Sequence, residues 1–177
     1  KLINSLNISL NDEEFIQQHK DGSTSFSRDR IFRFPVLLTF LMTNLQKGLQ
    51  REIAAFAEAI QSDGGSIPEV SKAAFCKARK KVRPEAFKAL SDVVLQGFYE
   101  SKEVRLWHDY RVLAVDGSTV ELPNSPEIQR EYGVFKYRKD GKAICMGRTL
   151  MMYDAVNHMT IRGSLDKMEE SETSMLW

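Results

Sequence analysis

The segment from Arg111 to Thr119 reads RVLAVDGST, and we expect the rest of the fold to be organised around it. The run from Val112 to Asp116 is almost continuously apolar and ends in a carboxylate, which is typical of a strand buried on both faces. Gly117 then predicts a tight turn, because Asp-Gly is a common turn pair. An ionised Asp is rarely buried without a partner. Asp116 is therefore either a metal-binding or catalytic carboxylate or a turn residue, and these residues alone leave both interpretations open.

The region before this strand has helical periodicity and no strand signal. Asn11 or Asp12 can cap one helix, and Ser71 is a good N-cap for another. Pro35 fits the first turn of a helix. Gly48 can terminate the helix that precedes it. We expect helical segments over residues 10–16, 27–33, 35–47, 49–61, 71–82 and 84–99.

The region after the strand has a different pattern. Two prolines make residues 121–126 irregular. Residues 128–132 predict a helical turn, and residues 136–142 a basic exposed loop. Two β-rich runs follow, 148–156 and 159–164, with Asn157-His158 as the turn between them. The pattern predicts an α+β, multidomain chain, with a helical region over residues 1–104 and a strand-containing region over residues 105–177.

Charge is unevenly distributed along the chain. The 177 residues carry a net charge of only +1, with 42% hydrophobic residues, so the total does not indicate a nucleic-acid partner. Between Ser71 and Lys88, however, seven basic residues stand against one acid, Glu85. A basic helix here either contacts DNA phosphates or is a solvated face, and composition favours neither. The residues we expect to bind DNA are Lys72, Lys77, Arg79, Lys80, Lys81 and Arg83.

The sequence does not support several other classes of protein. Cys76 and Cys145 are far apart and form no close-spaced metal motif. The three histidines lack metal-ligand spacing, and there is no P-loop or Gly-rich dinucleotide turn. No signal peptide is visible, and the most apolar stretch, 35–45, is about half of the ~20 residues that span a bilayer. We expect a cytoplasmic protein.

Two further carboxylates lie in the second half. Asp154 falls within a predicted strand and is either a metal ligand beside Asp116 or a structural residue bonded to neighbouring backbone or Arg148, and we favour the structural role. Asp166 precedes Glu169 by three residues, as in a capping box, so we expect it to cap a helix.

Together these segments resemble a known family, the insertion-sequence transposases of the DDE type, and within it the bacterial branch called insertion-sequence family four. The resemblance covers about residues 34–177. Its motifs are Val112–Ser118, Leu122–Asn124, Tyr132-Gly133, Arg148 and Leu150–Asn157, with Val70–Val82 and Pro84–Phe87 upstream.

The resemblance implies a helical DNA-binding region followed by an RNase H-like core. It also implies a reaction in which two Asp and one Glu hold two Mg²⁺ or Mn²⁺ ions that activate water or a DNA 3′-hydroxyl for attack on a phosphodiester. Asp116 matches the first catalytic and metal-binding Asp, whereas Asp154 matches a family position outside the catalytic three. The partner would be double-stranded DNA at transposon ends, bound by a homodimer or larger complex.

The positions that match the other two catalytic residues lie beyond Trp177, so we expect an incomplete catalytic domain containing the first three strands of the core. Such a chain would not cut DNA by itself, and its open sheet edge would be unpaired. The alternative is a non-catalytic helical DNA-binding or interaction protein derived from a transposase.

Overall fold

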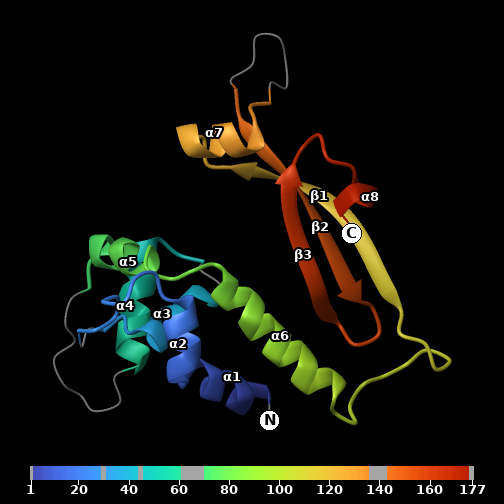
Figure 1. The fold of residues 1–177 in the computed structure, drawn as a ribbon, viewed down its shortest axis with the longest axis horizontal. Helices are drawn as coiled ribbons and strands as arrows, with labels where there is room; N and C mark the ends of the chain where they lie inside the picture. Colours follow the sequence, from blue (N-terminus) through green and yellow to red (C-terminus); the bar gives the residue numbers. More distant parts are fainter. Residues whose placement is uncertain (1, 29–30, 44–45, 61–69, 136–142, 176–177) are drawn as a thin grey trace. The chain divides into compact units, whose positions relative to one another are not determined.

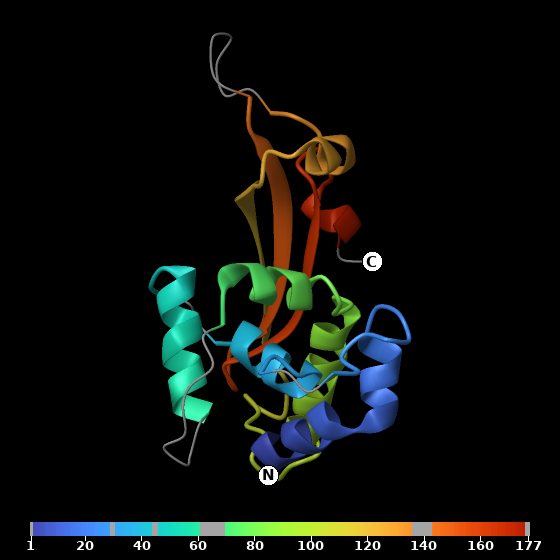
Figure 2. The same ribbon diagram turned by 90° about the vertical axis from the view of Figure 1, so that its left-hand side faces the viewer.

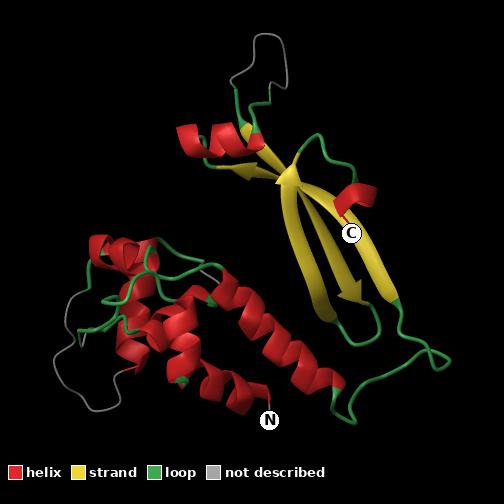
Figure 3. Cartoon of the chain, viewed as in Figure 1, coloured by secondary structure: helices red, strands yellow, loops and turns green. Residues whose placement is uncertain are grey.

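The computed structural model describes residues 2–28, 31–43, 46–60, 70–135 and 143–175. The chain forms two compact units, Lys1–Glu100 and Ser101–Trp177 (Figure 1). Helices make up the first unit, and a three-stranded antiparallel sheet dominates the second (Figure 3). The α+β prediction is therefore confirmed. None of the helices within the described ranges is long and apolar enough to cross a membrane.

The first unit contains six of the described helices, coloured blue to green in Figure 2. These are α1 (Leu2–Asn11), α2 (Glu13–His19), α3 (Phe34–Leu41), α4 (Leu49–Ile60), α5 (Lys72–Arg79) and α6 (Glu85–Tyr99). Three expectations were wrong: residues 10–16 span two helices, the described residues of 27–33 are not helical, and α3 ends before residue 42. Gly48 consequently precedes α4 and terminates no helix.

Helix starts follow the local capping signals. The side chain of Asp12 accepts a hydrogen bond from the backbone N–H of Phe15 at 2.8 Å, and Ser71 accepts one from Ala74 at 3.2 Å. Each satisfies a backbone donor that the first helical turn would otherwise leave unpaired. Pro35 occupies the first turn of α3. These three predictions are confirmed.

The hydrophobic core of the first unit is built around α3. Phe34 and Leu38 belong to one buried cluster with residues of α1 and α6. Leu37 and Phe40 belong to a second cluster that reaches α4 and α5. A helix that is apolar on several sides must be buried on several sides, and full burial of each such side chain contributes about 1.5–3 kcal/mol. Helix α3 thereby joins the two halves of the unit.

The second unit is a meander of three strands with two short helices. Its elements are β1 (Leu113–Leu122), α7 (Pro126–Tyr132), β2 (Cys145–Asp154), β3 (Met159–Lys167) and α8 (Glu172–Met175). The strand order is β1-β2-β3, and both pairings are antiparallel. A register shift near Met152 leaves Ile161 without a paired residue on β2, which is a β-bulge.

The central prediction about β1 was partly wrong. The strand does not end at Asp116 but continues through Gly117 to Leu122. The prediction that it is buried on both faces was also wrong, because its residues are mostly exposed. As the end strand of the sheet, β1 pairs only with β2.

Two further expectations in this unit were wrong. Asp166 lies within β3 opposite Arg148 and so caps no helix. The turn between β2 and β3 spans residues 155–158, with His158 at a positive φ of 57°. The predicted basic loop at 136–142 lies outside the described residues.

Candidate nucleic-acid interface and the Asp116 carboxylate

The six cations expected to bind DNA are all exposed, but they do not form one face. Lys72, Lys77 and Arg79 lie on α5, whereas Lys80, Lys81 and Arg83 follow its last residue. Only Lys77 and Lys81, which are four residues apart, line a groove in the surface of the first unit. The local structure therefore divides the basic run into two groups.

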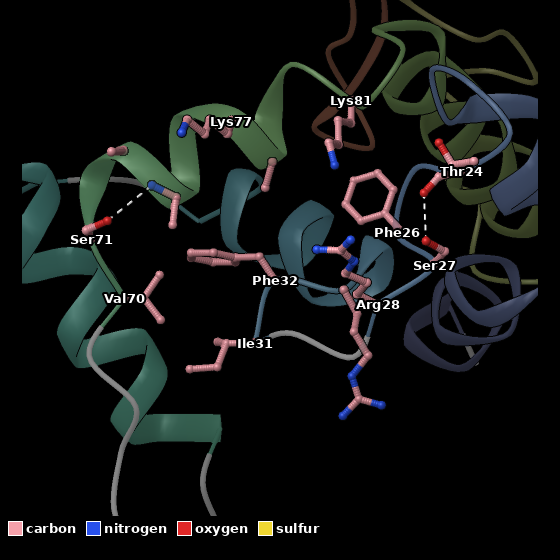
Figure 4. A pocket seen from close by; sticks show the side chains of 14 residues that line it. Thr24, Phe26, Ser27, Arg28, Ile31, Phe32, Val70, Ser71, Lys77 and Lys81 are labelled. Atoms are coloured by element: carbon pink, nitrogen blue, oxygen red, sulfur yellow. Dashed lines mark hydrogen bonds between the residues drawn. The ribbon is translucent and has the colours of Figure 1, made fainter.

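The groove has a volume of about 980 Å³ and lies between α5 and the segment that precedes α3 (Figure 4). Arg28 and Arg33 also line it, and none of the described residues that line it is acidic. Figure 4 shows the rings of Phe26 and Phe32 between Arg28 and the two lysines of the groove, Lys77 and Lys81. The remaining lining residues are small or aliphatic residues, threonine and serine: Thr24, Ser27, Ile31, Val70, Ser71, Ala73, Ala74 and Ala78.

The other cations of the run have different surroundings. The guanidinium of Arg79 lies 5.9 Å from the ring centroid of Phe75, which is a cation–π distance. Arg83 donates from its guanidinium to the carbonyl oxygen of Gln18 at 3.3 Å. Lys72 and Lys80 are exposed and do not line the groove.

A long-range backbone contact sets the second wall of the groove. Lys20 and Val82 form an isolated antiparallel bridge. Beside it, the N–H of Asp21 donates to the carbonyl of Lys81, and the N–H of Arg83 donates to the carbonyl of His19, both at 2.8 Å. The segment from residue 22 onward therefore starts beside the end of α5, which is why Arg28 and Arg33 reach a groove that α5 also lines.

Phe26 has an unusual backbone conformation within this wall. Its φ is 61°, which is rare for a bulky residue and costs about 1–2 kcal/mol relative to ordinary backbone. The ring packs edge-on against Phe34 with centroids 5.4 Å apart. Packing against the core thus holds Phe26 at the groove, and such backbone outliers are enriched at functional sites.

Gln50 of α4 fixes the opposite end of the groove. Its side-chain amide donates to the carbonyl of Val70 at 2.9 Å, and its carbonyl accepts from the N–H of Lys72 at 3.0 Å. These two bonds hold the start of α5, where Ser71 also caps the helix. Both ends of α5 are therefore tied to other elements.

Asp116 lies on β1, directly opposite Met151 of β2. Asp154 is opposite Leu113, three residues along the strand from Asp116. Because side chains alternate between the faces of a sheet, Asp116 and Asp154 project from opposite faces. The hypothesis that the two carboxylates share a metal is therefore wrong.

Asp154 has a structural role instead. It is fully buried, and its Oδ1 accepts from the backbone N–H groups of Val156 at 3.1 Å and Asn157 at 3.0 Å. Its Oδ2 accepts from the side-chain amide of Asn157 at 2.9 Å, with the guanidinium of Arg111 at 3.9 Å. The prediction of a structural Asp bonded to neighbouring backbone is confirmed, although its ionic partner is Arg111 and not Arg148.

Gly117 lies within β1 and makes no turn, and its missing side chain leaves room for a neighbouring carboxylate. A side chain at this position would collide with the carboxylate of Glu172 on α8. Glu172 therefore lies over the face of the sheet that carries position 117, which is the face opposite Asp116. The turn predicted at Asp116-Gly117 is therefore wrong, and the residue that approaches position 117 lies 55 residues further along the chain.

The described residues do not assemble the ligands of a two-metal site. Within the described ranges, no group of three or more His, Cys, Asp or Glu side chains gathers as metal ligands would. Asp116 contributes one carboxylate, whereas a two-metal site for phosphoryl transfer needs about three. The donor set in these ranges therefore does not fit two Mg²⁺ or Mn²⁺ ions.

Comparisons of the whole chain with protein-family models, curated proteins and solved structures found no match.

Proposed function

We propose that this chain binds double-stranded DNA through α5 and the residues that follow it. The observation that carries the proposal is the exposed cluster of cations around α5, bordered by a groove whose described lining residues include no acid. Lys and Arg side chains in such a cluster neutralise DNA phosphates and release counterions, which supplies affinity without sequence readout. A solvated basic helix would not need a second cationic wall, which Arg28 and Arg33 provide.

We further propose that the chain is part of a DDE-type transposase with an RNase H-like core. The support is the order of its parts: a helical region with a basic cluster, then an antiparallel meander whose first strand carries Asp116. In this role Asp116 would be the first metal ligand, and the metal ions would supply a nucleophile and charge stabilisation for phosphodiester cleavage and strand transfer. The other ligands would come from outside the described residues.

The second candidate function is a non-catalytic DNA-binding protein derived from a transposase. It is favoured because, in the described ranges, no group of three or more His, Cys, Asp or Glu side chains could hold a metal ion. The two candidates share DNA binding and differ in chemistry.

Electrophoretic mobility shifts at several salt concentrations test the binding. We expect a duplex to be retarded at low salt, and the shift to be lost when Lys77, Arg79, Lys80 and Lys81 are all reversed to Glu. A mobility shift that is unchanged by salt and by charge reversal would exclude the phosphate-contact model.

A nuclease assay with Mg²⁺ or Mn²⁺ tests the chemistry. We expect no cleavage by the 177-residue chain. Robust cleavage that disappears in Asp116→Ala would show that the chain contains a working site, and would exclude the non-catalytic candidate.

A further inference from the structure

The groove beside α5 differs from a plain phosphate-binding surface. Four cations line its walls: Lys77 and Lys81 belong to α5 and the residues after it, and Arg28 and Arg33 belong to the segment before α3. Its floor is apolar, and Phe26, Ile31 and Val70 in it are only half-buried. A groove that only held phosphates would not need an apolar floor.

The chemistry of the floor distinguishes two forms of DNA. In a duplex the faces of the bases are stacked inside the helix. A concave groove on a protein therefore contacts the sugar–phosphate backbone of a duplex and not the faces of its bases. In an unpaired strand the bases are free to lie on apolar and aromatic side chains while the phosphates follow a line of cations. Cationic walls with an apolar floor match the second arrangement.

We propose that this groove binds an unpaired DNA strand, with phosphates held by Lys77, Lys81, Arg28 and Arg33 and with bases against Phe26 and Ile31. The inference rests on the proposed DNA binding and adds a specific substrate to it. It also separates Lys77 and Lys81, which line the groove, from Lys72 and Lys80, which do not.

The division of the lysines gives a matched pair of variants. Lys77→Gln/Lys81→Gln removes two charges from the groove, and Lys72→Gln/Lys80→Gln removes two charges from the same short stretch outside it. Both pairs are exposed, so circular dichroism should show the fold unchanged. A third variant, Ile31→Asn, changes the floor without changing charge.

The experiment measures fluorescence anisotropy of a labelled oligothymidylate of about twelve nucleotides and of the same strand in a duplex with oligoadenylate. We expect the single strand to bind at least as tightly as the duplex. The groove variant should weaken single-strand binding about tenfold at low salt and reduce the slope of log K against log salt by about 1.4, since each lost phosphate contact removes about 0.7.

The controls make the result decisive. The Lys72/Lys80 variant should bind the single strand within about twofold of the affinity of the unchanged chain. Ile31→Asn should lower single-strand affinity about threefold or more without changing the slope of log K against log salt. Equal losses in the two lysine variants, or no effect of Ile31→Asn, would overturn the groove assignment. Salt-dependent binding of the duplex without binding of the single strand would overturn this inference and leave the proposed function standing. Binding of neither would overturn both.

Discussion

Asp154 accepts two hydrogen bonds from Asn157, one from its backbone N–H at 3.0 Å and one from its side-chain amide at 2.9 Å. Asn157 in turn pairs with the backbone of Arg105, donating to its carbonyl at 2.9 Å and accepting from its N–H at 2.8 Å. A fully buried carboxylate thus closes the β2–β3 turn and ties it to the segment leading into β1. The carboxylate oxygens of Asp154 therefore stabilise the folded structure.

The first prediction concerns this carboxylate. Asp154→Ala should destabilise the second unit by about 2–4 kcal/mol, because three donors lose their acceptor in a buried site. Asp166→Ala is the matched control, since Asp166 is an exposed strand residue, and its effect should stay within about 0.5 kcal/mol. Denaturant unfolding followed by tryptophan fluorescence reports on this unit, because both tryptophans belong to it. Equal effects of the two substitutions would contradict the structural role.

The turn at His108 and Asp109 gives a second prediction. Both residues have positive φ, 46° and 66°, between Trp107 and Tyr110, whose backbones exchange two hydrogen bonds of 2.9 Å. Such two-residue turns favour Asn-Gly. Changing His108 to Asn and Asp109 to Gly should therefore raise the free energy of unfolding by about 1 kcal/mol. A lower denaturation midpoint in this double variant would show that the two side chains stabilise the turn.

Glu127 gives a prediction about pH. Its own backbone N–H and the hydroxyl of Ser125 hydrogen-bond the carboxylate at the start of α7, which lowers the pKa of Glu127 below its usual 4.5. Because the folded-state pKa is depressed, the stabilisation is present above the unfolded pKa and is lost as pH falls through the folded value. An NMR titration should place the Glu127 midpoint below 4.5, and Ser125→Ala should raise it. A midpoint unchanged by that substitution would exclude the hydroxyl as a cause.

Local signals in the sequence predicted local structure well. Asp12 and Ser71 are visible as caps because a cap and its partner are three residues apart. The pattern also predicted separate helical and strand-containing regions. Asp116 was correctly placed on the first strand, but its position within the strand was wrong. The turn predicted at Gly117 was wrong, and the approach of Glu172 to this position is not visible in any local pattern.

The groove could be predicted only in part. The four-residue spacing of Lys77 and Lys81 places them on one side of a helix, and this signal was available in the sequence. Arg28 and Arg33 were missed because they reach the groove through the bridge between Lys20 and Val82, which are 62 residues apart. Contacts of this separation depend on the packed core and have no short-range pattern.

In the proposed function, cations around α5 contact DNA phosphates. The most direct test measures duplex affinity against salt concentration for the natural chain, for a variant with Gln at 77, 79, 80 and 81, and for a control with Gln at the exposed positions 102, 130, 162 and 167 of the second unit. The two variants lose the same total charge. We predict a slope of log K against log salt of about −3 or steeper for the natural chain and the control, and a slope shallower by about 2 or more for the α5 variant. A flat slope in the natural chain, or equal slopes in the two variants, would contradict phosphate contacts by the cations around α5.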